Sequence, residues 1–138
     1  MKGNALIDTN IWIYAITKND LEKHQIAQKL IRELKPNRRI LSSPQIVNEI
    51  SFTLMRNGVP DPEIRELMEA LYADLRVINF TPQIVRQASK IRETYKYKFW
   101  DSLIIATALS SYCLILYSDQ LPHNAVIEDR LRILNPFK

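Results

Sequence analysis

Three acidic side chains stand alone in long uncharged segments of this sequence. Asp8 is the only charged residue between positions 3 and 17, Glu49 the only one between 40 and 55, and Asp101 the only one between 99 and 118. Burying an ionised carboxylate is costly unless the group gains hydrogen bonds, a cation or a raised pKa. The fold must therefore compensate each of these acids.

A shared site would explain the three acids together. Two carboxylates about 4 Å apart repel each other by roughly 4 kcal/mol at an effective dielectric near 20, and a divalent cation removes that repulsion. Oxygen ligands alone suit Mg²⁺ or Mn²⁺. Such an ion activates water and neutralises charge that develops on a phosphodiester, so the pattern favours metal-dependent phosphodiester hydrolysis.

Each acid also has a structural interpretation when it is taken singly. Asp8 or Asp101 would stabilise a helix by capping its first turn. Glu49 would extend into solvent or pair with Arg39 or Arg56. Three separate coincidences are less probable than one shared site, but the sequence alone leaves both interpretations open.

Hydrophobic periodicity and turn residues predict strands that alternate with helices. We expect strands at 5–8, 39–41, 76–80, 113–117 and 131–134, and helices at 21–34, 44–57, 61–74, 82–95 and 101–110. Asp8, Thr9 and Asn10 are expected to form a polar turn after the first strand. This alternation predicts a parallel sheet with helices on both faces, and a site where the strand order reverses.

Composition indicates one globular domain spanning residues 1–138, with 46% hydrophobic and 25% charged residues. Cys113 is the single cysteine, which excludes a disulfide framework and a thiolate zinc site and suits a reducing cytoplasm. The start of the chain does not read as a signal peptide, and the uncharged stretch 102–118 is too short and too rich in hydroxyl groups to span a bilayer. We therefore expect a cytoplasmic protein.

Charge and glycine content narrow the classes of partner further. The net charge of +4 is compatible with a polyanion but does not identify one. The chain has two glycines, so it contains neither a Walker phosphate loop nor a dinucleotide-binding fingerprint. Phosphoacceptor domains share the α/β pattern and Mg²⁺, but they resemble one another through a paired acid near the start and a late Lys, and this chain has neither.

Several short segments carry a resemblance to a known family. They are Leu6-Ile7-Asp8-Thr9-Asn10, Asn48-Glu49, Trp100-Asp101-Ser102-Leu103-Ile104-Ile105-Ala106, Leu116-Tyr117-Ser118-Asp119 and Asn135-Pro136-Phe137. In order and spacing they resemble the PIN-domain nucleases, in particular the VapC-type toxins of bacterial and archaeal toxin-antitoxin pairs. The match covers nearly the whole chain.

This resemblance implies a three-layer α/β/α sandwich and endonucleolytic cleavage of RNA with Mg²⁺ or Mn²⁺. It implies that Asp8, Glu49 and Asp101 are the catalytic, metal-binding carboxylates. Thr9 and Asn10 match the polar residues that follow the first acid and would orient the site or contact phosphate, although turn formation explains them equally well. A homodimer, and a small antitoxin whose tail blocks the acidic crevice, are also implied.

One departure from the family pattern concerns the fourth acid. The family usually shows a hydroxyl residue, any residue and then Asp after the fourth strand, whereas this chain has Ser118, Asp119 and Gln120. Either Asp119 reaches the metal, or Gln120 takes the place of the acid as a neutral oxygen ligand. We predict Asp119 as the fourth metal-binding and catalytic residue and Ser118 as a substrate contact. The alternative is a catalytically silent PIN fold that acts as an RNA- or protein-binding module.

Aromatic and basic residues interleave at 95–100, directly before Asp101. They would supply stacking and phosphate contacts to single-stranded RNA. Aromatic residues at the start of a helix more often anchor a core or an oligomer interface, so this segment is a secondary candidate for the substrate site.

Overall fold

A single six-stranded sheet forms the centre of the protein in the computed structural model, which describes residues 3–36 and 39–138. Its strands are β1 (Asn4–Ile7), β2 (Arg39–Ser42), β3 (Arg76–Val77), β4 (Cys113–Tyr117), β5 (Val126–Ile127) and β6 (Leu131–Leu134). They lie in the order β3-β2-β1-β4-β6-β5. All neighbouring pairs are parallel except β5 and β6, so the prediction of a mainly parallel sheet is confirmed.

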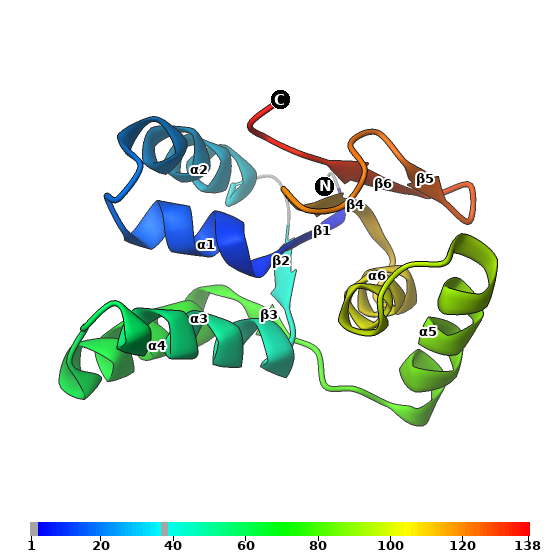
Figure 1. Cartoon of the computed structure of the whole chain (residues 1–138), viewed down its shortest axis with the longest axis horizontal. Helices are drawn as coiled ribbons and strands as arrows, with labels where there is room; N and C mark the ends of the chain where they lie inside the picture. The colour runs from blue at the N-terminus through cyan, green and yellow to red at the C-terminus, as the bar shows by residue number, and fades with distance from the viewer. Residues whose placement is uncertain (1–2, 37–38) are drawn as a thin grey trace.

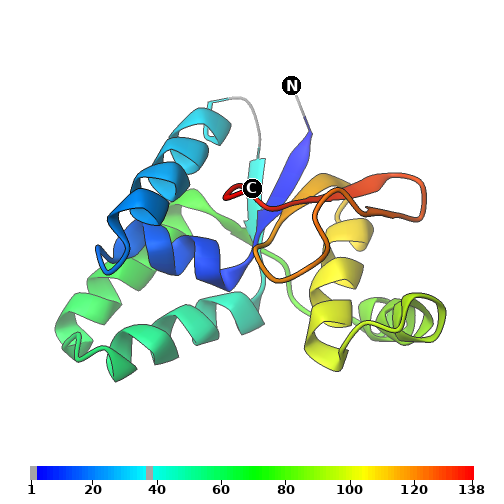
Figure 2. The same cartoon turned by 45° about the horizontal axis from the view of Figure 1, so that its top comes forward.

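Helices cover both faces of this sheet. They are α1 (Thr9–Ile16), α2 (Leu21–Leu34), α3 (Pro44–Arg56), α4 (Asp61–Asp74), α5 (Pro82–Tyr95) and α6 (Phe99–Ser110). Figures 1 and 2 show α1 to α4 on one side of β1 and β2, and α5 and α6 on the other. The expected α/β/α sandwich is therefore confirmed.

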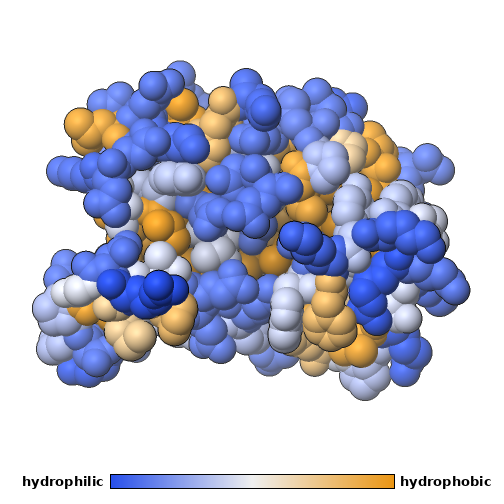
Figure 3. Space-filling model, in the orientation of Figure 1, coloured by the Kyte–Doolittle hydropathy of each residue, from blue (hydrophilic) through white to orange (hydrophobic). Residues whose placement is uncertain are grey.

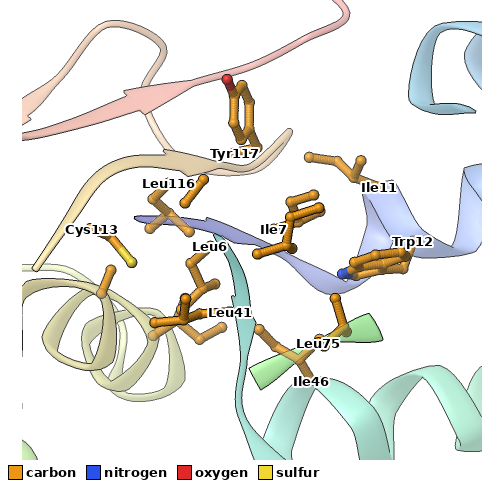
Figure 4. Packing of buried hydrophobic residues seen from close by; sticks show 14 of the residues in the cluster. Leu6, Ile7, Ile11, Trp12, Leu41, Ile46, Leu75, Cys113, Leu116 and Tyr117 are labelled. Atoms are coloured by element: carbon orange, nitrogen blue, oxygen red, sulfur yellow. The ribbon is translucent and has the colours of Figure 1, made fainter. Parts of the chain in front are cut away.

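The core is built around β1. This strand is paired on both sides, with β2 and β4, and leads directly to the first acid, Asp8. Leu6 is fully buried and lies in register between Leu41 of β2 and Leu116 of β4, as Figure 4 shows. Burial of one large aliphatic side chain contributes about 1.5–3 kcal/mol, so this row of leucines fixes the three strands tightly. The carboxyl end of β1 is consequently a rigid platform.

Four features differ from the sequence prediction by more than one residue at an end. The polar turn expected at 8–10 is wrong, because α1 begins at Thr9, directly after β1. Helix α6 begins at Phe99 rather than at Asp101. Strand β3 is limited to Arg76–Val77, because its partner β2 ends at Ser42. The two-residue strand β5 was not predicted at all, since a strand that short carries no alternating pattern.

The strand order reverses next to β1. Strands β2 and β3 follow on one side of β1, while β4 and β6 lie on the other. The backbone N–H of Asp8 donates to the Tyr117 carbonyl oxygen at 2.9 Å, which extends the pairing of β1 and β4 by one residue. In parallel α/β sheets, crevices at such a switch point are the usual place for a site.

The exterior is mainly hydrophilic on the face seen in Figure 3, where hydrophobic side chains show through in several places. Within the described part of the chain, no helix has the length and hydropathy needed to cross a membrane. Cys113 is buried in the core, as its apolar surroundings in the sequence predict.

Candidate active site

Asp8 is half-buried and lies at the centre of a polar crevice at the carboxyl end of β1. It is the N-cap of α1, where its Oδ1 accepts a hydrogen bond from the Thr9 backbone N–H at 2.8 Å. Its Oδ2 accepts a second one from the Ser118 hydroxyl at 3.1 Å. The pKa of Asp8 is raised to about 6, chiefly because the carboxyl is desolvated; the two hydrogen bonds oppose this rise, and the nearby Glu49 and Asp101 add to it. The carboxylate is oriented, but its charge is incompletely compensated.

Glu49 reaches the crevice from α3, on the side of the sheet occupied by α1 to α4. Ser43 caps this helix through a hydrogen bond to the Ile46 N–H, and Pro44 occupies its first turn. Glu49 Oε2 accepts a hydrogen bond from the Thr9 hydroxyl at 2.9 Å, and Oε1 accepts one from Gln45 Nε2 at 2.9 Å. Glu49 is exposed and is held by two neutral donors, and among the described residues it forms no ion pair with Arg39 or Arg56.

Asp101 comes from the opposite side of the sheet, in the first turn of α6. Its side chain is partly buried, and desolvation raises its pKa above the ordinary value. Lys98 opposes this shift, while the negative charge of Glu49 adds to it. Because Glu49 influences the pKa of both aspartates, the three acids form one electrostatic unit.

A pocket of about 210 Å³ connects these side chains. Its wall contains Asp8, Thr9, Asn10, Gln45, Glu49, Trp100, Asp101, Ile104 and Gln120. The three lone acids of the sequence therefore share one crevice, although they come from the end of β1, where Asp8 follows the strand directly, from α3 and from α6.

No basic side chain neutralises the crevice directly. Across residues 3–36 and 39–138, the one ion pair joins Lys35 and Asp74 at 2.9 Å on the surface. Three carboxylates that share a pocket without an ion pair constitute an unfavourable arrangement unless a cation or protons are bound.

Ser118, Asp119 and Gln120 occupy different positions relative to this pocket. Ser118 is buried, and its hydroxyl oxygen accepts hydrogen bonds from the Gln120 and Leu121 N–H groups while it donates to Asp8. Gln120 lines the pocket, whereas Asp119 does not belong to its wall. Asp119 Oδ1 instead accepts a hydrogen bond from Asn10 Nδ2 at 3.3 Å. Of the two alternatives for the fourth position, this geometry favours Gln120.

The donor set suits a hard divalent cation, although the side chains do not converge on one point. In the part of the chain that the structure describes, no three acidic, histidine or cysteine side chains form a complete metal-binding group. Mg²⁺ needs less than that, because it keeps several waters and is usually bound through one or two carboxylates. Asp8 together with Glu49 or Asp101 meets this requirement.

Gln45 and Trp100 also line the pocket, although neither was predicted as a leading candidate. Gln45 was not among the candidates, although it lies four residues before Glu49, the spacing at which helical side chains touch. Trp100 belongs to the aromatic and basic segment that ranked as a secondary candidate, and it forms part of the pocket wall. Its position directly before Asp101 was the available signal.

Fold and site together define an α/β protein with an acidic crevice at the switch point of a parallel sheet. The PIN domain family model matches residues 5–124. The chain therefore belongs to the PIN domain family, and the family prediction made from its motifs is confirmed.

Solved structures with the same fold come from several bacteria. A toxin-antitoxin complex from Klebsiella pneumoniae has a TM-score of 0.74 and 22% identity, over 98% of this chain and 99% of that one. VapBC2 from Rickettsia felis, bound to a promoter DNA fragment, has a TM-score of 0.70 and 17% identity, over 95% of this chain and 98% of that one. VapC20 from Mycobacterium tuberculosis, described as a sarcin-ricin loop cleaving toxin, has a TM-score of 0.68 and 19% identity, over 82% of this chain and 87% of that one. No protein of curated function matches the sequence.

Proposed function

We propose that this protein is a Mg²⁺- or Mn²⁺-dependent endoribonuclease and the toxin of a toxin-antitoxin pair. In this proposal residues 1–138 form one domain, which acts in the cytoplasm. Membership of the PIN domain family supports nuclease chemistry. The similarity to VapC20, described as a toxin that cleaves the sarcin-ricin loop, supports RNA as the substrate. The toxin role draws on the similarity to toxin-antitoxin complexes.

The observation that carries the nuclease proposal is an acidic crevice whose three carboxylates form no ion pair within the described part of the chain. The half-buried Asp8 shares a pocket with two further carboxylates, and its pKa is raised to about 6. In this proposal Asp8, Glu49 and Asp101 are the catalytic carboxylates that hold the metal, and Gln120 supplies a neutral oxygen in the fourth position. When bound, a divalent cation there lowers the pKa of a water molecule and offsets the charge of the phosphodiester.

The surrounding hydroxyl groups position the acids. Ser118 holds one oxygen of Asp8, and Thr9 holds one oxygen of Glu49, so both hydroxyl groups donate to carboxylates. We propose that they orient the catalytic groups rather than contact the substrate. Asn10 stays at the pocket wall, fixed by Asp119, and is the better candidate for a contact to phosphate. Lys98 adds positive charge beside Asp101.

RNA cleavage with purified variants tests the proposal. We expect wild-type protein to cut single-stranded RNA in Mn²⁺ or Mg²⁺ and to stop when a chelator is added. Asp8→Asn should abolish cleavage, because it removes the central charge of the crevice while the amide oxygen still caps α1. Asp74→Asn is the matched control, since it removes an exposed acid whose one partner is Lys35 on the surface. Cleavage that persists in Asp8→Asn would contradict the proposal.

A second function follows from the fourth position of the crevice. Gln120, a neutral residue, lines the pocket, while Asp119 lies outside its wall. A crevice with one acid fewer would bind metal weakly and would favour a binding module over an enzyme. RNA that stays intact in Mn²⁺ but is bound by the protein would support this alternative.

Partner proteins are part of the proposed role. We propose a homodimer and a small antitoxin whose tail occupies the acidic crevice. Phe52 and Met55 lie one helical turn apart on α3, and both are exposed, so this face of α3 is a candidate for the dimer interface. Light scattering on wild-type protein and on the double variant Phe52→Ala/Met55→Ala tests it, with loss of the dimer as the expected result. A variant that remains dimeric would place the interface elsewhere.

A further inference from the structure

A second pocket adjoins the acidic crevice. It has a volume of about 380 Å³ and is lined by Pro44, Gln45, Asn48, Glu49, Phe80 and Trp100. Gln45, Glu49 and Trp100 also line the acidic crevice, so the two hollows share a wall. A ligand that lies in the crevice can therefore extend into the second pocket without leaving the surface.

The walls of this pocket combine flat hydrophobic groups with amides. Trp100 is 58% exposed and Phe80 is half-buried, so their rings remain available to a ligand. Asn48 and Gln45 contribute amide groups, each of which contains a donor and an acceptor. The one charged wall residue is Glu49, which repels a phosphate group. These features suit an uncharged planar heterocycle better than an anion.

Gln45 has an unused acceptor. Its Nε2 donates to Glu49 Oε1 at 2.9 Å, which fixes the orientation of the amide. Among the described residues, its buried Oε1 atom has no hydrogen-bond partner. An unpaired buried acceptor is costly, so a ligand that offers an N–H group gains a favourable contact here. Because the atom is enclosed, a small rotation of the Gln45 side chain must accompany that contact.

We propose that this pocket binds one unstacked nucleobase of the RNA strand whose scissile phosphate lies in the acidic crevice. Trp100 and Phe80 hold the base by stacking, and Asn48 and Gln45 contact its edge, which presents an N–H donor. Recognition of single-stranded RNA by splayed bases on aromatic side chains is common, and the shared wall places such a base next to the phosphate. The proposal rests on the proposed ribonuclease function and names the part of the substrate that sets its sequence preference.

Binding in a chelator tests the pocket separately from catalysis. The probe is a fluorescein-labelled single-stranded RNA octamer that contains one wild-type cleavage site, or a random octamer pool if no cleavage is found. Fluorescence anisotropy measures its affinity in EDTA. We expect Trp100→Ala to weaken binding about ten-fold, because one stacked base is lost, and Trp100→Phe to retain most of the affinity. Tyr72→Ala is the control, because it removes an aromatic side chain of similar exposure from α4.

Base identity is the second measurement. Replacing single bases of the octamer by abasic residues should weaken binding to wild-type protein at one position next to the cleaved bond, and Trp100→Ala and Phe80→Ala should abolish that sensitivity. Asn48→Ala should relax the base preference at the same position, whereas Gln25→Ala, which removes an exposed amide from α2, should leave it unchanged.

Two outcomes separate this inference from the proposed function. If wild-type protein cleaves RNA but the pocket variants bind and cleave intact and abasic octamers as the wild type does, the base pocket is wrong and the aromatic pair belongs to a protein interface. If no RNA is cleaved in Mn²⁺ or Mg²⁺, the nuclease proposal fails. In that case stacking-dependent binding in EDTA still supports the base pocket, and binding that ignores Trp100 and Phe80 overturns it.

Discussion

At the scale of single residues, the site is organised by neutral donors that hold charged acceptors. Ser118 and Thr9 each give their one hydroxyl proton to a carboxylate. The sequence indicated Asp8, Glu49 and Asp101 because each is isolated among uncharged residues. For Gln45 the only signal was its spacing of four residues from Glu49, because an amide carries a smaller desolvation cost than a carboxylate. The sequence also could not decide between Asp119 and Gln120. That choice depends on how the chain turns after β4, a feature that leaves no trace in the residue pattern.

Asp8 should make the metal-free protein less stable as the pH rises. Its pKa is about 6 in the folded protein against 3.8 for the ordinary carboxyl, so between pH 4 and 6 the folded state binds more protons than the unfolded state. The free energy of unfolding therefore falls through this window, by up to roughly 3 kcal/mol. Asp8→Asn should remove this fall and be the more stable protein at pH 7.5.

Urea denaturation in EDTA at pH 4.5 and 7.5 measures this effect. Asp74→Asn serves as the control, because an exposed ion pair contributes less than about 1 kcal/mol. Wild-type protein that is more stable than Asp8→Asn at pH 7.5 would show that the fold already compensates the Asp8 charge.

The fourth position can be tested with two conservative substitutions. Gln120→Glu places a further carboxylate of the same shape at the pocket wall and should increase Mn²⁺ affinity about ten-fold or more. Asp119→Asn should change that affinity less than three-fold, because Asp119 is not part of the pocket wall and its oxygen contacts Asn10. Calorimetric titration with Mn²⁺ gives both values. A large loss of affinity in Asp119→Asn would make Asp119 the fourth ligand.

At the scale of elements, the ends of a helix were predicted accurately where hydrophobic periodicity and capping residues are both clear in the sequence. Helix α4 spans Asp61–Asp74 and α5 spans Pro82–Tyr95, as the periodicity and the capping residue Thr81 indicate. Helix α1 was missed because its residues are almost uniformly apolar, so they show no polar face. Asp8 was the available signal, since an N-cap aspartate marks the start of a helix.

Helix α6 should be the most sensitive element to loss of volume. Every residue from Ser102 to Leu109 is buried, because the helix packs between the sheet and α5. Ile105→Ala should lower the free energy of unfolding by about 2–5 kcal/mol. Val85→Ala on the exposed face of α5 should change it by less than about 1 kcal/mol. Chemical denaturation measures both, and equal effects would contradict the described packing.

At the scale of the whole molecule, the parallel sheet explains why distant acids meet. Strand alternation predicted the layers, and the switch point beside β1 then places the end of β1, the first half of α3 and the start of α6 around one crevice. The sequence did not reveal the second pocket, because Phe80 and Trp100 come from segments between elements or at a helix start, where spacing rules do not apply. The fold was therefore more predictable than the detailed shape of the site.

X-ray diffraction from crystals soaked in Mn²⁺ tests the central claim most directly, because the anomalous signal locates the ion. We predict a peak in the acidic crevice within coordination distance of an Asp8 carboxylate oxygen, shared with Glu49 or Asp101, and no such peak in Asp8→Asn crystals. A crevice that stays free of manganese at saturating concentration, or a peak held by acids elsewhere on the surface, would contradict it.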